Sequence, residues 1–294
     1  MSQTSFGKTQ EKTKVLISGH EGFIGKHLTK RLDELKIDWV GLDLKNGHDI
    51  RNPEIVEQFF KIPKPDVVIH LAALAGVRKG EEIPYDYITT NIGGTSRLLE
   101  MAEKYKVERF IHFSSSSVYG QKKPPLKEND LLCPISSYGI TKMAGEMLCR
   151  KSKVKTFIVR PFTVYGENGR PDQVFYKWLG QIKKGKPIDF YGGGTSGRGY
   201  TYVGDLVEGV IQLLGYQSNK SDTFNLGGNK VIRLKDVLKL YQRFSKKNFK
   251  VNRMPMPSVD VYESWANIGK AKKLLGFNPD TNFEKKLEDI IKNY

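Results

Sequence analysis

The stretch that decides the fold is residues 14–25, Lys-Val-Leu-Ile-Ser-Gly-His-Glu-Gly-Phe-Ile-Gly, an apolar run followed by a turn with three glycines. The run predicts a buried strand of a parallel sheet. Apolar residues then repeat at helical spacing from Phe23 to Leu35, and a second apolar run over residues 39–42 ends in Asp43. The segment therefore predicts a β-α-β unit with the glycine turn between its first strand and its helix.

The same alternation continues along the chain. It predicts strands at 67–70, 110–113 and 156–159, separated by helices near 55–60, 85–105 and 137–151. This rhythm is typical of an α/β protein with a doubly wound parallel sheet.

Beyond residue 160 the pattern becomes rich in Gly and Pro, with helices expected at 173–184, 206–214, 234–244 and 268–275. We therefore expect a disordered tail over 1–13, a dinucleotide-binding domain over 14–160 and a smaller C-terminal α/β substrate-binding lobe over 161–294. Residues 200–214 and 223–226 are expected to return to the larger sheet.

The glycine turn indicates the ligand of the larger domain. Gly19, Gly22 and Gly25 let backbone N–H groups and the helix N-terminus approach a pyrophosphate. Asp43 lies 18 residues after Gly25 (43 − 25), close to the spacing of about 20 that is typical of a carboxylate on the adenosine ribose. Such a carboxylate would repel the 2′-phosphate of NADP, so NAD is the expected cofactor. The alternative is that Asp43 only ends the strand in a turn.

Composition narrows the class of protein. The 294 residues are 38% hydrophobic, yet no apolar run reaches the roughly 20 residues that span a bilayer. The polar N-terminus lacks the apolar centre of a signal peptide, so we expect a cytoplasmic protein without a membrane partner. Cys133 and Cys149 have neither CxxC spacing nor a nearby His, so no metal site is expected.

The formal net charge of +16 allows three interpretations: a solvated lysine-rich surface, attraction of an anionic substrate, or nucleic-acid binding. The lysines are spread along the chain and form no basic block, so we expect no nucleic-acid partner.

The glycine spacing resembles that of the extended short-chain dehydrogenase/reductases, and the resemblance extends along nearly the whole chain. It implies a Rossmann-type fold and further cofactor contacts in three segments. Phe23 and Ile24, between Gly22 and Gly25, would contact the cofactor in the turn, and Asp49 and Ile50 would contact the adenine. The third set lies at and after the third strand: Leu71, Ala72, Ala73 and Asn91.

The same resemblance supplies the reacting residues. Tyr138 and Lys142 lie at i and i+4 on one helix face, where the cation favours the phenolate. The family uses such a pair as general base and acid and as its electrostatic tuner and ribose anchor. Ser115, counted back from Val118-Tyr119, matches the family's hydroxyl that binds the reacting hydroxyl. Ordinary interpretations are an amphipathic helix surface and a polar serine loop.

The two residues after Ser115 indicate which type of reaction to expect. Sugar-nucleotide dehydratases and decarboxylases carry carboxylates after the position of Ser115, whereas this chain has Ser116 and Ser117. Elimination needs an acid for the leaving hydroxyl, so hydride removal and return is favoured. Ser116 and Ser117 are expected among the substrate contacts.

The segment from Arg160 to Asp172, Arg-Pro-Phe-Thr-Val-Tyr-Gly-Glu-Asn-Gly-Arg-Pro-Asp, resembles the motif of glucuronate 4-epimerases. Thr163 and Arg170 match residues that hold the sugar carboxylate, and the planar fork of Arg suits that group. A Gly/Pro loop with a solvated Arg is the plain alternative. Arg198 and Asp260 match contacts to the UDP moiety, although 257–260 departs from the usual Pro-Gly-Asp turn.

Together the resemblance implies NAD-dependent C4 epimerisation of a UDP-sugar through a 4-keto intermediate, with UDP-glucuronate to UDP-galacturonate favoured, by a homodimer. Three alternatives stay open: a 4-epimerase for UDP-galactose or another UDP-sugar, a UDP-glucuronate decarboxylase, and a noncatalytic dinucleotide-sensing or RNA-binding relative. Retention of both Tyr138 and Lys142 argues against the last one.

Overall fold

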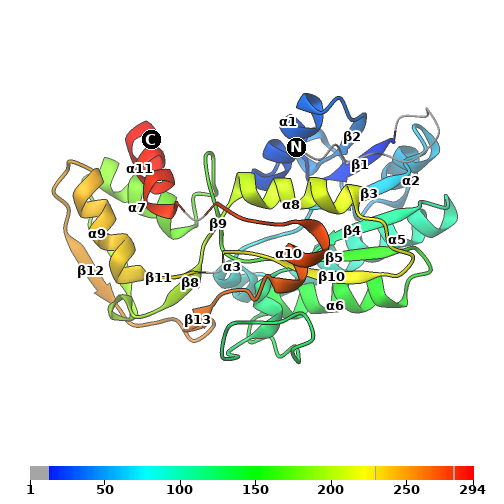
Figure 1. The fold of residues 1–294 in the computed structure, drawn as a ribbon. Helices are drawn as coiled ribbons and strands as arrows, with labels where there is room; N and C mark the ends of the chain where they lie inside the picture. The colour runs from blue at the N-terminus through cyan, green and yellow to red at the C-terminus, as the bar shows by residue number, and fades with distance from the viewer. Residues whose placement is uncertain (1–12, 229, 281) are drawn as a thin grey trace.

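The computed structural model describes residues 13–228, 230–280 and 282–294, and its centre is one six-stranded sheet (Figure 1). All five strand pairs in it are parallel. The order is β2 (Trp39–Leu42), β1 (Val15–Ser18), β3 (Val67–His70), β4 (Arg109–Phe113), β5 (Thr156–Pro161) and β10 (Asp222–Leu226). The order runs outward in both directions from β1, which confirms the doubly wound, Rossmann-type fold.

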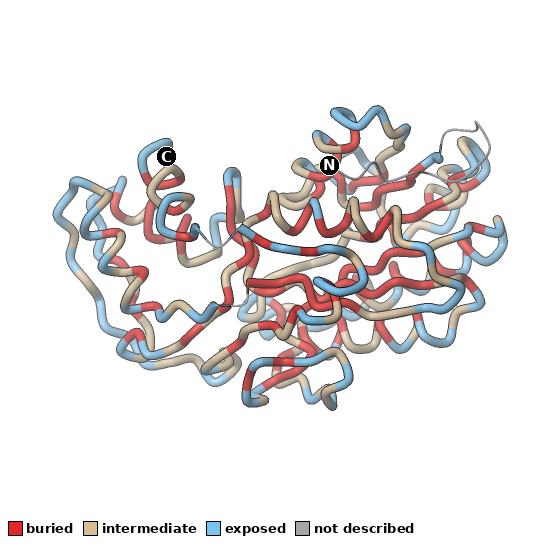
Figure 2. The backbone as a smooth tube through the Cα atoms, in the orientation of Figure 1, coloured by how far each residue is buried: buried red, intermediate tan, exposed pale blue. Residues whose placement is uncertain are grey.

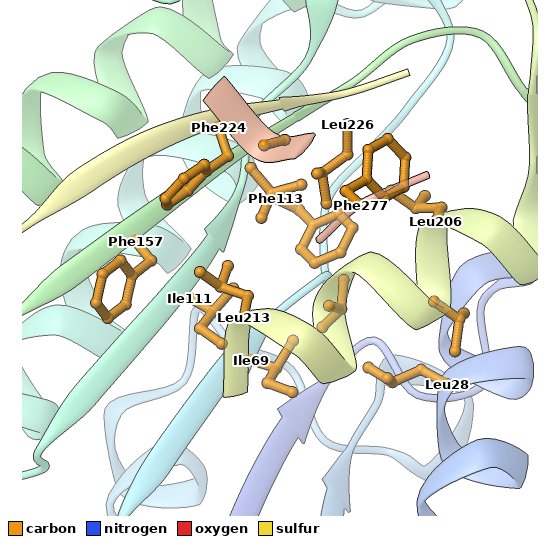
Figure 3. Close-up of a cluster of buried hydrophobic side chains, with 14 of the residues drawn as sticks. Leu28, Ile69, Ile111, Phe113, Phe157, Leu206, Leu213, Phe224, Leu226 and Phe277 are labelled. Carbon is orange, nitrogen blue, oxygen red and sulfur yellow. The ribbon is translucent and has the colours of Figure 1, made fainter. Parts of the chain in front are cut away.

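Helices cover both faces of the sheet. One face packs α1 (Phe23–Glu34), α8 (Val203–Gly215) and α10 (Gly269–Leu275), and the other packs α2 (Pro53–Lys61), α5 (Gly94–Lys104) and α6 (Ser137–Lys151). Residues adjacent along a strand point to opposite faces, so Ile17 and Leu16 belong to different clusters. Figure 3 shows the first cluster, in which Leu28 of α1 and Leu206 and Leu213 of α8 face the strand residues Ile69 and Ile111.

The connection after β3 contains more breaks than the sequence indicates. It forms α3 (Val77–Glu82), α4 (Pro84–Tyr87) and a π-helical stretch, η2 (Ile88–Gly93), before α5 begins. The helix predicted over 85–105 is confirmed, because helical backbone runs without a gap from Pro84 to Lys104, but its middle is π-helical. In this π-helical stretch the Asn91 amide bonds both backbone groups of Leu74 and so ties the helix to the loop after β3.

The smaller lobe has its own apolar core, visible as a separate buried region in Figure 2. Around Trp178 and Tyr241 pack α7 (Val174–Lys183), α9 (Leu234–Phe244) and α11 (Phe283–Asn293). Three small sheets complete the lobe and its junction with the large one. They pair β11 (Val231–Arg233), β8 (Gly197–Gly199) and β13 (Glu263–Ser264); β12 (Val251–Met254) and β7 (Ile188–Tyr191); and β6 (Val164–Tyr165) and β9 (Thr201–Tyr202).

The chain crosses between the lobes more than once. After α7 and β7 in the smaller lobe, α8 packs against α1 and β10 adds the edge strand beside β5. A division at residue 160 stays a prediction, and the tail expected over 1–13 falls outside the described residues except for residue 13. Among the described residues no helix is long and apolar enough to cross a membrane.

Candidate active site

The glycine turn is built so that only glycines fit. Gly19 has φ of +81°, in the left-handed region, and a Cβ there would lie 2.6 Å from the backbone nitrogen of Ala72. A Cβ at Gly25 would lie 2.3 Å from the Gly19 carbonyl oxygen. The turn thus draws the first residues of α1, Phe23 and Ile24 among them, close to the end of β1.

The N-terminus of α1 is open to an anion. Its N-cap is Gly22, which provides no side-chain hydrogen bond, and its first turn holds no acidic residue. The first backbone N–H groups of α1 therefore have no side-chain acceptor, and a phosphate placed there would accept their hydrogen bonds and be stabilised by the helix dipole. The surroundings fit the pyrophosphate of a dinucleotide.

Asp43 lies beside this turn, at the end of β2, and is only 8% exposed. Its carboxylate accepts hydrogen bonds from the backbone N–H groups of Glu21 and Lys45, both at 2.9 Å. Two bonds leave acceptor capacity on a carboxylate, enough for ribose hydroxyls. The strand-ending turn and the ribose role are therefore compatible, because Asp43 caps the short helix η1 (Leu44–Asn46) in either case.

The remaining predicted cofactor residues differ in their exposure and in their hydrogen-bond partners. Ile50 is buried and packs against Gly94, whereas the Asp49 carboxylate is held by the Arg51 guanidinium, which lowers the Asp49 pKa. Leu71, Ala72 and Ala73 follow β3 directly and are partly exposed. Asn91 is fully used in bonds to Leu74 and Thr141, so it holds this loop in place.

The reacting residues meet where α6 crosses the end of β4. Lys142 is buried and its Nζ donates to the carbonyl oxygen of Phe113 at 2.6 Å. Tyr138 lies one turn earlier, close enough to Ser115, the N-cap of η3 (Ser116–Tyr119), for the Ser115 hydroxyl to lower the Tyr138 pKa. The structure thus places Ser115, Tyr138 and Lys142 near one another.

Burial dominates the electrostatics here. It lowers the pKa of Lys142 to about 8 and raises the pKa of Tyr138. The Arg170 charge and the Ser115 hydrogen bond act on Tyr138 in the opposite direction. A guanidinium and a hydroxyl from other elements therefore offset part of the effect of burial on the Tyr138 phenol, whose pKa is still raised.

Ser116 and Ser117 begin η3 and are both partly exposed. The hydroxyl of Ser115 donates to the Ser117 hydroxyl at 3.2 Å and accepts from the Ser117 backbone N–H at 3.1 Å. These bonds fix the direction of the Ser115 hydroxyl and leave the Ser116 side chain free of any intramolecular bond found among the described residues.

A cleft of about 610 Å³ lies between the lobes. Four predicted substrate residues line it, Thr163, Arg170, Arg198 and Asp260, whereas Ser115, Ser116, Ser117 and Tyr138 do not. Arg170 connects the two groups, because its charge acts directly on Tyr138. Aromatic and charged side chains that the sequence did not single out also line it: Arg78, Asp172, Lys177, Trp178, Asp189, Tyr191 and Tyr200.

Arg170 is held by a carboxylate within its own loop. Its Nε and Nη2 donate to the two oxygens of Asp172 at 2.9 and 2.7 Å, and both side chains are at least one-third exposed. Gly76, after β3, is close enough that a Cβ would lie 3.3 Å from Asp172. The planar fork is therefore already in a geometry that suits a carboxylate.

The far end of the cleft is different. Arg198 donates to the backbone carbonyl oxygens of Gly197, Val261 and Tyr262 and has no carboxylate among its hydrogen-bond partners in the described residues. Burial lowers its pKa. Asp260 instead accepts from Arg78, whose guanidinium also lies 4.2 Å from the centre of the Tyr191 ring.

Arg78 and Tyr191 could not be found by spacing. Arg78 lies on α3, the helix after β3, and Tyr191 is the last residue of β7, but lone Arg and Tyr residues at such positions are common surface residues. Only the tertiary fold brings them together. Within residues 13–228, 230–280 and 282–294 no group of His, Cys, Asp or Glu could hold a metal ion.

Comparison with known proteins agrees with this geometry. The sequence model of the NAD dependent epimerase/dehydratase family matches residues 15–227. The chain belongs to this family. The match extends from the first strand of the sheet through β10, so it covers both the glycine turn and the Tyr138–Lys142 pair.

Relatives of similar length are also known. A UDP-glucuronate 4-epimerase of Thermodesulfobacterium geofontis is 36% identical over 83% of this chain and 76% of its own length. A solved UDP-glucuronic acid 4-epimerase of Bacillus cereus, in complex with UDP-glucuronic acid and NAD, is 33% identical with a TM-score of 0.89, over 96% of this chain and 99% of that one. A UDP-glucose 4-epimerase of Thermotoga maritima with UDP-glucose is 28% identical, with a TM-score of 0.88 over 95% and 98%.

Proposed function

We propose that this protein interconverts UDP-glucuronate and UDP-galacturonate by NAD-dependent epimerisation at C4. The observation that carries the choice of sugar is Arg170, which lines the cleft, acts electrostatically on Tyr138 and is already paired with a carboxylate. A neutral hydroxymethyl group has no use for that charge.

The residues present fit a dinucleotide, as the open N-terminus of α1 and the Asp43 carboxylate indicate. Gly19, Gly22 and Gly25 would hold the pyrophosphate, Asp43 the adenosine ribose and Lys142 the second ribose. Bound NAD supplies a hydride acceptor and donor at the sugar C4. Asp43 would disfavour NADP through its charge.

Tyr138 removes the proton from the C4 hydroxyl and later returns it. Ser115 binds the same hydroxyl, and Lys142 stabilises the phenolate from one helical turn away. Because the Lys142 pKa is lowered to about 8, its ammonium group begins to lose its proton near that pH. The Tyr138–Lys142 pair is therefore sensitive to pH.

Carboxylate binding protects the intermediate. A 4-keto glucuronate is a β-keto acid and loses CO₂ when its carboxylate bond aligns with the carbonyl π system. Arg170, Thr163, Ser116 and Ser117 would hold the carboxylate in another orientation, so positioning matters as much as proton transfer. The diphosphate would pair with Arg198, and Asp260 would face the nucleotide at the same end of the cleft.

The second candidate is a UDP-galactose 4-epimerase, which is favoured by the likeness to the Thermotoga maritima enzyme. A decarboxylase ranks lower because Ser116 and Ser117 replace its acid, and a noncatalytic protein ranks lowest because Ser115, Tyr138 and Lys142 are assembled.

The test is to incubate purified protein with UDP-glucuronate, UDP-galactose and UDP-glucose in separate reactions and to identify products by NMR. We expect UDP-galacturonate from UDP-glucuronate at a rate at least tenfold above that of the neutral sugars, which is the low end for one charge-assisted bond. Faster turnover of UDP-galactose would establish the second candidate. Release of CO₂ with a UDP-pentose would establish the decarboxylase.

We also propose that two copies associate through α4, η2 and α6. Four apolar side chains are exposed on these neighbouring elements: Tyr85, Ile88, Ile140 and Met147. Ile140 and Met147 are seven residues apart and so share one face of α6. Light scattering should give a dimer for the wild type and a monomer for Met147→Glu, and an unchanged mass would show that this surface is not the interface.

Both cysteines are free thiols, which supports the cytoplasm as the compartment.

A further inference from the structure

The contact between α6 and the end of β4 contains one more pair than the reaction uses. Tyr138, Lys142 and Glu146 lie at i, i+4 and i+8 on one face of α6. They face three consecutive residues. Tyr138 lies near Ser115, whose hydroxyl lowers the Tyr138 pKa. Lys142 donates to the Phe113 carbonyl oxygen at 2.6 Å, and the Ser114 hydroxyl donates to Glu146 at 2.5 Å.

Glu146 is fixed from several elements. It has no exposed surface, and it accepts from Arg160 Nε at 2.7 Å and Arg160 Nη2 at 2.6 Å. Arg150 adds a bond at 2.8 Å from the rim. Arg160, on β5, is itself only 1% exposed and also donates to the Tyr119 hydroxyl at 2.7 Å.

Such a cluster is not explained by stability alone. A buried ion pair seldom stabilises a fold more than apolar residues of the same volume, because desolvation offsets the attraction. What a bidentate pair supplies is a fixed geometry. Here that geometry extends to Ser114, the residue next to Ser115.

We propose that Ser114 and Glu146 are positioning residues, and that their hydrogen bond sets the alignment of Ser115 on the β4 end with Tyr138 on α6. The proposal rests on the proposed function only in that Tyr138 carries the proton transfer. Neither residue needs to touch the sugar or the cofactor.

Glu146 has a second, electrostatic effect. Two groups on α6, Cys149 and Glu146, act on Lys142 to raise its pKa, and the charge of Lys142 in turn lowers the pKa of His112 on β4 and of His70 on β3. Burial lowers the pKa of His70 to about 3 and that of His112 well below its usual value, and it raises the pKa of Cys149 to about 12. All three are neutral near pH 7, so Glu146 is the charge that raises the Lys142 pKa against burial.

Two variants separate geometry from charge. Ser114→Ala removes the bond to Glu146 and keeps the ion pair with Arg160, so kcat should fall about tenfold while KM stays within about twofold. Its pH profile should keep the wild-type alkaline limb. Glu146→Gln should lower kcat as well, and should move that limb to lower pH, because Lys142 then loses its proton more easily.

The matched control is Ser152→Ala, which removes a serine–carboxylate bond of 2.7 Å to Glu103 at the exposed end of α6. It should leave kcat and the pH profile unchanged. If Ser114→Ala keeps the wild-type kcat, or lowers it no more than Ser152→Ala does, the positioning role is wrong. If Glu146→Gln does not fold, Ser114→Ala decides alone.

A measurement without substrate separates this proposal from the proposed function. In protein with ¹³C-labelled lysine, NMR titration should show one lysine with a midpoint near pH 8, absent from Lys142→Arg. The midpoint should move down in Glu146→Gln and stay in Ser114→Ala. An unmoved midpoint in folded Glu146→Gln would overturn the charge effect even if no UDP-sugar were turned over.

Discussion

The cofactor half and the substrate half of the site are built in different ways. In the cofactor half, one continuous segment from β1 to Asp43 supplies the turn, the helix N-terminus and the carboxylate, and most of its contacts come from backbone groups. In the substrate half, Arg78 on α3, Arg170 and Asp260 come from segments far apart in the chain and line one cleft, where Arg78 pairs with Asp260 and Arg170 pairs with Asp172. A contiguous backbone site is specific for a ligand class, whereas an assembled site of side chains distinguishes members of that class.

Both halves converge on Tyr138, so its loss should have the largest effect. Tyr138→Phe should lower kcat about 100- to 10,000-fold with every accepted sugar, because it removes the proton-transfer group and keeps the ring. NAD binding, followed by calorimetry, should be unchanged. Tyr216→Phe, which alters a ring packed on Phe157 and Phe224, is the control and should keep activity. Near-native turnover by Tyr138→Phe would assign the base elsewhere.

The next test breaks only the substrate half. Arg170→Ala should lower kcat/KM for UDP-glucuronate about 10- to 100-fold, the range for a hydrogen bond to a charged group, and should affect UDP-galactose much less. When the sugar carboxylate is no longer held by Arg170, the 4-keto intermediate should also lose CO₂ and give a UDP-pentose, which NMR detects.

Arg243→Ala removes a comparable arginine–carboxylate pair at 2.6 Å on the outside of the smaller lobe and serves as its control. Equal losses for charged and neutral sugars in Arg170→Ala would mean that Arg170 supports the fold or the diphosphate.

A third test breaks only the cofactor half. The wild type should bind NAD more tightly than NADP, because Asp43 repels a 2′-phosphate. Asp43→Asn should weaken NAD binding about tenfold and narrow the preference, since one charge-assisted bond becomes neutral. Fluorescence titration with both dinucleotides measures it, with Asp236→Asn on the smaller lobe as control. Equal wild-type affinity for NADP would remove Asp43 from this role.

The difference between the halves also explains what the sequence could predict. The glycine turn, the strand ends and the pair on α6 are set by local spacing, and β2, β3 and α6 have the predicted bounds. The partner of Asp260 is Arg78, 182 residues away, so only the tertiary fold reveals this pair. Asp172 lies two residues from Arg170, but nothing in a Gly- and Pro-rich loop indicates that the two side chains face each other. The small sheets have strands of two to four residues, too short for an apolar alternation to show.

The pH dependence tests the point where the halves meet. Burial lowers the Lys142 pKa to about 8, so the cation that supports the phenolate is present below that pH and is lost as pH rises through it. The kcat/KM profile should therefore fall above about pH 8, to roughly one-tenth one unit higher. A profile flat to pH 9.5 would mean that catalysis does not need the charged lysine.

The smallest effect should come from Asp172, which sharpens the account of the substrate half. Asp172 occupies both donors of Arg170 that face it, so a sugar carboxylate must share or replace that partner. Asp172→Asn keeps the size of the side chain and removes the charge that competes with the sugar carboxylate. Because a partly exposed ion pair contributes little free energy, KM for UDP-glucuronate should fall only about two- to threefold, and KM for UDP-galactose should not change. Thermal unfolding should change little for the same reason. A rise in KM for UDP-glucuronate alone would mean the opposite, that Asp172 orients the guanidinium fork more than it competes for it. Steady-state kinetics of Asp172→Asn with both sugars decide between these two, because competition and orientation change KM for UDP-glucuronate in opposite directions.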